Sequence, residues 1–79
     1  MVNHSRYQDA AQEVLEEVCR AKEKFPADFN SAHEGFAVLL EEVDEMWDEV
    51  KRNNTPRSIE EAIQVGAMAV RYIAEFSNK

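Results

Sequence analysis

Two proline-containing breaks divide the chain into three segments, and in each segment apolar residues recur at the three- and four-residue spacing of an α-helix. The breaks surround Pro26 and Pro56. Because a proline disfavours helical geometry in the residue before it, a helix should end ahead of each break. The pattern predicts an all-α fold with short connections, so that neighbouring helices run antiparallel in a three-helix, hairpin-like unit. The helices are expected over residues 6–25, 32–52 and 58–77.

A serine followed three residues later by Gln or Glu forms a capping box, which begins a helix. This pattern stands near the start of all three segments, at Ser5–Gln8, Ser31–Glu34 and Ser58–Glu61. Agreement between capping signals and apolar periodicity strengthens the helical prediction. Between the first two segments, Phe29 is expected to pack at the edge of the core.

The chain length favours self-association. Residues 1–79 make one domain at most, and a domain of this size is marginally stable alone. The single cysteine, Cys19, excludes an internal disulfide. The third segment is apolar over most of its circumference, which indicates packing on several sides. We therefore predict a homodimer or tetramer with the third helix at the interface; the alternative is a compact monomer in which that helix lies centrally.

Charge and hydropathy limit the classes of partner. The net charge of −7 argues against direct binding to nucleic acid, whose phosphates attract basic patches. The net charge does not exclude binding of a metal-bound nucleotide, because the metal supplies positive charge. No apolar run reaches the ~18 residues of a membrane span, and the first residues lack the apolar core of a signal peptide. We expect a cytoplasmic protein without a membrane partner.

Acidic residues are concentrated in the second segment. Residues 41–49 hold six carboxylates in nine positions, and Glu42 and Glu45 are neighbours on one helix face. In the third segment, Glu61 projects on an otherwise apolar flank, where a carboxylate is costly unless it is paired or bound to metal. Antiparallel packing would place Glu61 opposite Glu42 and Glu45. These three carboxylates are interpreted as a metal-competent site; the alternative is a solvated acidic face.

The spacing Glu42-x-x-Glu45 followed by Glu61-x-x-Gln64 resembles the Glu-x-x-Glu and Glu-x-x-Asp signature of MazG-like all-α nucleoside triphosphate pyrophosphatases. The stretches 33–50 and 61–73 are also similar to one compact branch of that family. The resemblance implies a helical oligomer that hydrolyses a nucleoside triphosphate to monophosphate and pyrophosphate.

Carried over by position, the resemblance implies that Mg²⁺ or Mn²⁺ is held by Glu42, Glu45, Glu61 and Gln64, and that Glu41 and Glu45 have catalytic roles. Gln64 departs from the family pattern, since an amide oxygen can coordinate a hard cation but carries no negative charge and cannot act as a base. The chain is also shorter than many members, which have a fourth helix. These departures favour an alternative function, a non-catalytic helical oligomer or protein-interaction module that kept the scaffold without turnover.

Two further residues carry expectations. Arg71 projects among the more exposed positions of the third segment and is expected to form a surface ion pair with a nearby glutamate. Trp47 follows the apolar stripe of the second segment, which favours a place in the core or at an interface rather than against a base.

Overall fold

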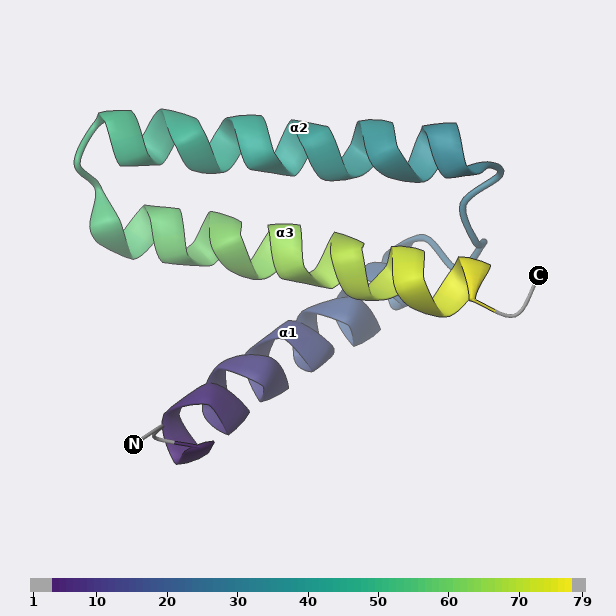
Figure 1. Ribbon diagram of the computed structural model, residues 1–79, viewed down its shortest axis with the longest axis horizontal. Helices are drawn as coiled ribbons and strands as arrows, with labels where there is room; N and C mark the ends of the chain where they lie inside the picture. The colour runs from purple at the N-terminus through teal and green to yellow at the C-terminus, as the bar shows by residue number, and fades with distance from the viewer. Residues whose placement is uncertain (1–3, 78–79) are drawn as a thin grey trace.

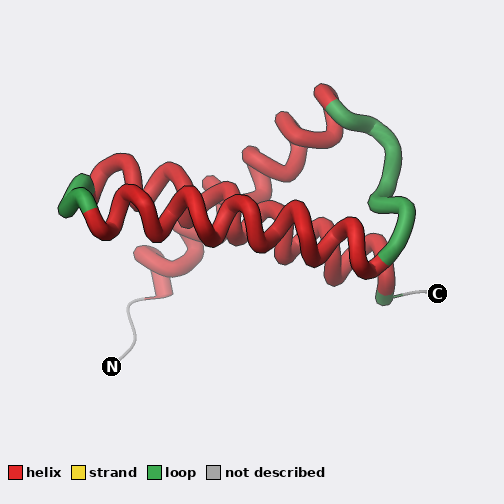
Figure 2. The backbone as a smooth tube through the Cα atoms, turned by 90° about the horizontal axis from the view of Figure 1, so that it is seen from above, coloured by secondary structure: helices red, strands yellow, loops and turns green. Residues whose placement is uncertain are grey.

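The computed structural model describes residues 4–77, and over this range the chain forms three α-helices and no strand. They are α1 (His4–Lys24), α2 (Ala32–Lys51) and α3 (Thr55–Phe76). As Figure 1 shows, α2 and α3 form an antiparallel hairpin, and α1 crosses α3 obliquely. The longer connection, which leads from α1 to α2, and the short turn between α2 and α3 are seen at opposite ends in Figure 2. The predicted all-α class is confirmed.

The start of α2 lies at the predicted capping box, although the Glu34 carboxylate bonds the residue before the N-cap instead of the N-cap itself. Ser31 is the N-cap, and its hydroxyl accepts a hydrogen bond from the backbone N–H of Glu34 at 3.1 Å. The carboxylate of Glu34 in turn accepts from the backbone N–H of Asn30 at 3.0 Å. Two backbone donors that the helix itself cannot satisfy are thus paired, which fixes where the connection enters α2.

The other two predicted capping boxes are wrong. Helix α1 is already helical at His4, so Ser5 lies inside it. Helix α3 begins three residues before Ser58, because Asn54 is the N-cap and accepts from the backbone N–H of Arg57 at 3.3 Å. Proline fits the first turn of a helix, where its missing N–H has no partner to lose, so Pro56 continues the helix that it was expected to precede.

Helix α3 is the centre of the fold. It packs against both α1 and α2, whereas α1 and α2 do not pack against each other within residues 4–77. Ala67 and Met68 of α3 are buried, and apolar side chains of all three helices pack around them: Val14, Val18, Ala21, Val38, Leu39, Tyr72 and Phe76. This central position accounts for apolar residues on several flanks of α3, as the alternative interpretation of the sequence anticipated.

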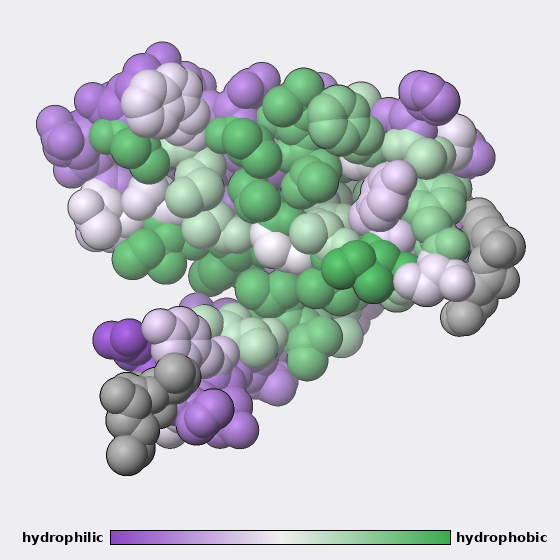
Figure 3. Space-filling view, in the orientation of Figure 1, coloured by the Kyte–Doolittle hydropathy of each residue, from purple (hydrophilic) through white to green (hydrophobic). Residues whose placement is uncertain are grey.

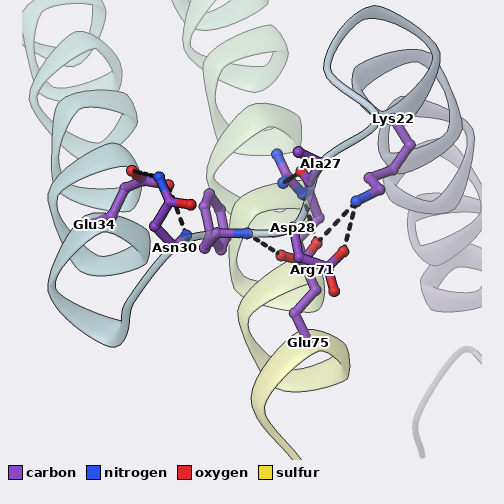
Figure 4. Close-up of polar contacts among 8 residues, drawn as sticks. Lys22, Ala27, Asp28, Asn30, Glu34, Arg71 and Glu75 are labelled. Atoms are coloured by element: carbon purple, nitrogen blue, oxygen red, sulfur yellow. Dashed lines mark hydrogen bonds and ion pairs between the residues drawn. The ribbon is translucent and has the colours of Figure 1, made fainter.

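The connection between α1 and α2 is fastened to the C-terminal half of α3. Phe29 is buried as predicted, and its backbone N–H donates to the Glu75 carboxylate at 2.8 Å. Arg71 donates to Glu75 at 2.9 Å and to the carbonyl oxygen of Ala27 at 3.4 Å (Figure 4). Its guanidinium also lies 4.1 Å from the centre of the Phe29 ring.

The expected ion pair of Arg71 with a nearby glutamate is confirmed, since Arg71 pairs with Glu75 four residues later, but its expected exposure is wrong. Only 6 % of Arg71 is exposed, because the connection folds over this part of α3. Charge-assisted hydrogen bonds are stronger where water is excluded, so Arg71 and Glu75 hold the connection in place. Sequence periodicity cannot reveal such a cover, since it shows which face of a helix is polar but not what loop crosses it.

A stripe of large apolar side chains on α2 remains exposed. Its members follow heptad spacing and are 41 to 60 % exposed: Phe36, Leu40, Val43, Trp47 and Val50. Ile59 and Ile73 of α3 are exposed as well. Apolar surface covers much of the α2–α3 hairpin in the view of Figure 3. Trp47, expected in the core or at an interface, thus lies outside the core of the single chain. None of the helices in the described part has the length and hydropathy needed to cross a bilayer.

Candidate metal site

Packing of α2 against α3 brings three carboxylates together. One side-chain oxygen from each of Glu42, Glu45 and Glu61 lies within 4.8 Å of the other two. The antiparallel turn explains this alignment, because Glu45 lies six residues before the end of α2 and Glu61 six residues after the start of α3. At 1.5 Å per residue, both positions stand about 9 Å from the turn. The predicted inward direction of Glu61 is confirmed.

The charge of Glu45 disfavours ionisation of both Glu42 and Glu61. Burial, followed by the charges of Glu45 and Glu61, raises the pKa of Glu42 from 4.5 to about 7. Burial and then the charge of Glu45 also raise the pKa of Glu61. Negative charge is therefore held close together at a cost to the folded chain, and a cation placed among these oxygens would relieve it.

The donor set suits a hard divalent cation. All three groups offer carboxylate oxygens, which Mg²⁺, Mn²⁺ and Ca²⁺ prefer, and no sulfur or imidazole belongs to the group of three. Glu45 is exposed, whereas Glu42 and Glu61 are partly buried. A cation held here would retain an open side toward solvent, as Mg²⁺ sites that keep bound waters require.

Of the two other predicted site residues, Gln64 is partly buried beside these carboxylates, whereas Glu41 is exposed. Gln64 is partly buried and lines a cavity of about 400 Å³ together with Glu42. It also lines a second cavity, of about 340 Å³, together with Glu61. Glu41 is exposed and is not among the three converging carboxylates, although its charge contributes to the raised pKa of Glu42. The fold thus brings Gln64 close to the carboxylates and leaves Glu41 at their outer side.

Helix α1 contributes a wall that the sequence did not reveal. Arg20, Lys24 and Phe25 line the same cavity as Glu42 and Gln64. Arg20 is held by an ion pair with Glu17 at 2.8 Å, and the Lys24 ammonium lies 5.5 Å from the centre of the Phe25 ring. The signal for this wall in the sequence was a pair of basic residues four apart, Arg20 and Lys24, followed by the aromatic Phe25. The way α1 lies across α3 could not be derived from its periodicity.

Comparison of the chain with protein-family models, with curated proteins and with solved structures found no match in any of the three.

Proposed function

We propose that the chain binds Mg²⁺ or Mn²⁺ through Glu42, Glu45 and Glu61 and hydrolyses a nucleoside triphosphate to monophosphate and pyrophosphate, as its resemblance to the MazG-like pyrophosphatases implies. The observation that supports this most is the convergence of three carboxylates from two helices beside a cavity lined by basic residues. Acidic residues on one helix face are common, but the third carboxylate comes from another helix and is partly buried.

Each residue has a distinct role in the proposed reaction. Glu42, Glu45 and Glu61 would hold the metal, Glu42 and Glu61 from the more buried side, and Gln64 would add an amide oxygen. When bound, the metal supplies positive charge that stabilises the phosphates and makes water more acidic. Glu45 is exposed and accepts the proton of the attacking water, while Glu41 orients that water or holds a second ion from the outer side. A bond forms between water oxygen and the α-phosphorus, and the bond to the departing pyrophosphate breaks.

We also propose that the chain forms a homodimer or tetramer. Helix α3 is packed by α1 and α2 on two flanks, so its remaining exposed apolar residues, Ile59 and Ile73, join the exposed stripe of α2 in forming the interface. Large contiguous apolar surface on a single chain typically marks an interaction site. The third helix thus contributes to the interface together with α2.

A non-catalytic helical assembly or protein-interaction module is the second candidate. Two observations favour it: the exposed apolar stripe of α2 needs a partner whether or not the chain is an enzyme, and Gln64 brings no charge to the carboxylate group. In that case the carboxylates form an acidic surface without turnover.

A pyrophosphate-release assay separates the two functions. The chain is incubated with each common ribo- and deoxyribonucleoside triphosphate and with Mg²⁺ or Mn²⁺, and added inorganic pyrophosphatase converts the product to phosphate. Activity with at least one substrate, reduced about 100-fold or more by Glu45→Gln, supports the enzyme. Asp44→Asn removes the same charge from an exposed position on α2 and is the matched control. Absence of turnover with every substrate and both metals contradicts the enzymatic proposal.

A further inference from the structure

The first half of α1 extends beyond the rest of the molecule. Of residues 4–15, only Val14 packs against the core, and the others are exposed. We call residues 4–15 the arm. In Figure 1 the arm projects away from the α2–α3 hairpin on the far side of α3 from α2. The radius of gyration, 13.5 Å, accordingly exceeds the value of about 12 Å that a compact domain of this length would have.

The arm carries an apolar row that nothing covers within the described chain. Tyr7, Ala11 and Leu15 are spaced by four residues and therefore lie side by side on one surface of the helix. Tyr7 is 56 % exposed and Leu15 is 50 % exposed. Tyr7 and Ala11 also continue the seam whose later members, Val14 and Val18, pack on the core. A helical stretch of this length is only marginally stable in water without such packing, so the arm lacks a partner that its sequence provides for.

The exposed stripe of α2 is a second uncovered surface, and its length matches that of the arm. The stripe extends from Phe36 to Val50, which corresponds to about 21 Å, and the arm is about 17 Å long. The two surfaces cannot meet within one chain. Helices α1 and α2 lie on opposite sides of α3 in Figure 1 and do not pack against each other within residues 4–77.

Charges beside the two surfaces are complementary. Arg6 and Glu13 of the arm are seven residues apart, and so are Asp44 and Lys51, which directly follow stripe residues on α2. All four are exposed. If the arm lies along α2 in the same direction, Arg6 comes near Asp44 when Glu13 comes near Lys51. Exposed pairs of this kind contribute little affinity, but they favour one direction and register over the others.

We propose that the arm of one copy packs along the exposed α2 stripe of a second copy, while the arm of the second copy packs in the same way on the first. Such an exchange is a closed two-fold contact, in which each copy gives one arm and receives one. A second copy covers both surfaces at once. The proposal rests on the self-association proposed above and adds which segments meet.

The apolar area favours two reciprocal contacts over a single one. The large apolar side chains of the arm and the stripe are 41 to 60 % exposed. From the usual areas of such side chains, one arm on one stripe would bury up to roughly 700 Å² of apolar surface. A single contact is thus smaller than the ~1,000 Å² that a specific interface requires, whereas two contacts, up to about 1,400 Å², lie within the usual range.

Sedimentation of the full chain over a range of concentrations tests the role of the arm. The natural chain, of 9.1 kDa, should associate at least in pairs. Tyr7→Ala should move the midpoint of dissociation to a concentration about tenfold higher or more, because an aromatic anchor is lost from both contacts. Asp9→Ala is the matched control. Asp9 is exposed on the opposite side of the arm, so its truncation should not raise that concentration.

Disulfide trapping tests which segments meet. Single-cysteine chains are prepared in a Cys19→Ser background, with Ala11→Cys on the arm and either Val43→Cys or Val50→Cys on the stripe; these changes nearly preserve side-chain size. A disulfide requires Cα atoms within about 7 Å of each other. When arm and stripe chains are mixed and oxidised, at least one combination should give a mixed dimer in higher yield than Asp9→Cys gives with the same stripe chains.

The possible failures are distinguishable. Cross-links between two stripe cysteines without an arm–stripe product, or an unchanged midpoint for Tyr7→Ala in a chain that associates, would overturn the exchange and leave self-association intact. A natural chain that sediments at 9.1 kDa at every concentration would overturn both. Masses that keep growing with concentration would show head-to-tail contacts that do not close, and would overturn the reciprocal pair.

Discussion

Glu42→Gln should stabilise the folded chain in the absence of metal while removing its response to metal. The pKa of the Glu42 carboxyl is 4.5 ordinarily and about 7 in the fold, where burial is the first cause and the charges of Glu45 and Glu61 follow. The folded chain therefore keeps this proton over a wider pH range than the unfolded chain. By linkage, stability decreases as pH rises from about 4.5 to about 7 and stays lower above that range.

The size of the effect follows from the same shift. At about 1.4 kcal/mol per pH unit, a rise from 4.5 to about 7 corresponds to at most roughly 3.4 kcal/mol. Glu42 is only partly buried, so solvent screening lowers this value, and we expect a gain of about 1–2 kcal/mol at pH 8. For a domain of this size, that corresponds to an increase in Tm of at least about 4 °C.

Urea unfolding followed by circular dichroism, at pH 4.5 and pH 8 and in EDTA or 10 mM MgCl₂, measures these changes. In EDTA the variant and the natural chain should be similar at pH 4.5 and diverge at pH 8, and added Mg²⁺ should stabilise only the natural chain. Asp44→Asn controls for the reduced net charge. A variant that is less stable than the natural chain at pH 8 in EDTA, or a difference independent of pH, would refute the assignment of mutual repulsion to this group.

Three further substitutions test the packing of α2 against α3, the ionised state of Glu75 and the proposed interface. Gly35→Ala should lower stability by about 1 kcal/mol or more in urea unfolding, because the added carbon would lie 2.9 Å from the Tyr72 ring and this overpacking exceeds the gain in helix propensity; an increase would contradict it. Burial alone would raise the pKa of Glu75, but the Phe29 N–H, Arg71 and Lys22 together hold it below its ordinary value. Glu75→Gln should therefore lower stability above pH 4.5 and flatten the loss seen on acidification; an unchanged pH profile would count against this. Leu40→Lys should give a helical monomer in sedimentation while the natural chain associates; equal masses would oppose the proposed interface.

The hairpin of α2 and α3 was predictable from the sequence because its determinants are local. Apolar periodicity located both helices, and the short connection required them to be antiparallel, which placed Glu61 opposite Glu42 and Glu45. The start of α3 was misplaced, since Asn54 and Pro56 give a stronger helix start than Ser58 does.

The rest of the site depends on contacts between distant segments. The burial of Arg71 is caused by a connection more than forty residues earlier in the chain, and no periodic pattern reports that cover. The direction in which α1 crosses α3 is set by the fit of side chains such as Val14 against Gly66, where an added carbon would lie 3.0 Å from Val14. Arg20 and Phe25 line the cavity beside Glu42 only as a result of that crossing, so this cavity could not be predicted from the sequence.

The attachment of α1 to a single neighbour gives the molecule a movable part. Not one residue of α1 is buried, whereas the segment that follows it is anchored by Phe29, Arg71 and Glu75. Elements with so little burial open locally at a lower free energy than the remainder of a domain. We expect α1 to move about its C-terminal end. This motion would open and close the cavity beside Glu42, while the α2–α3 hairpin keeps the three carboxylates together.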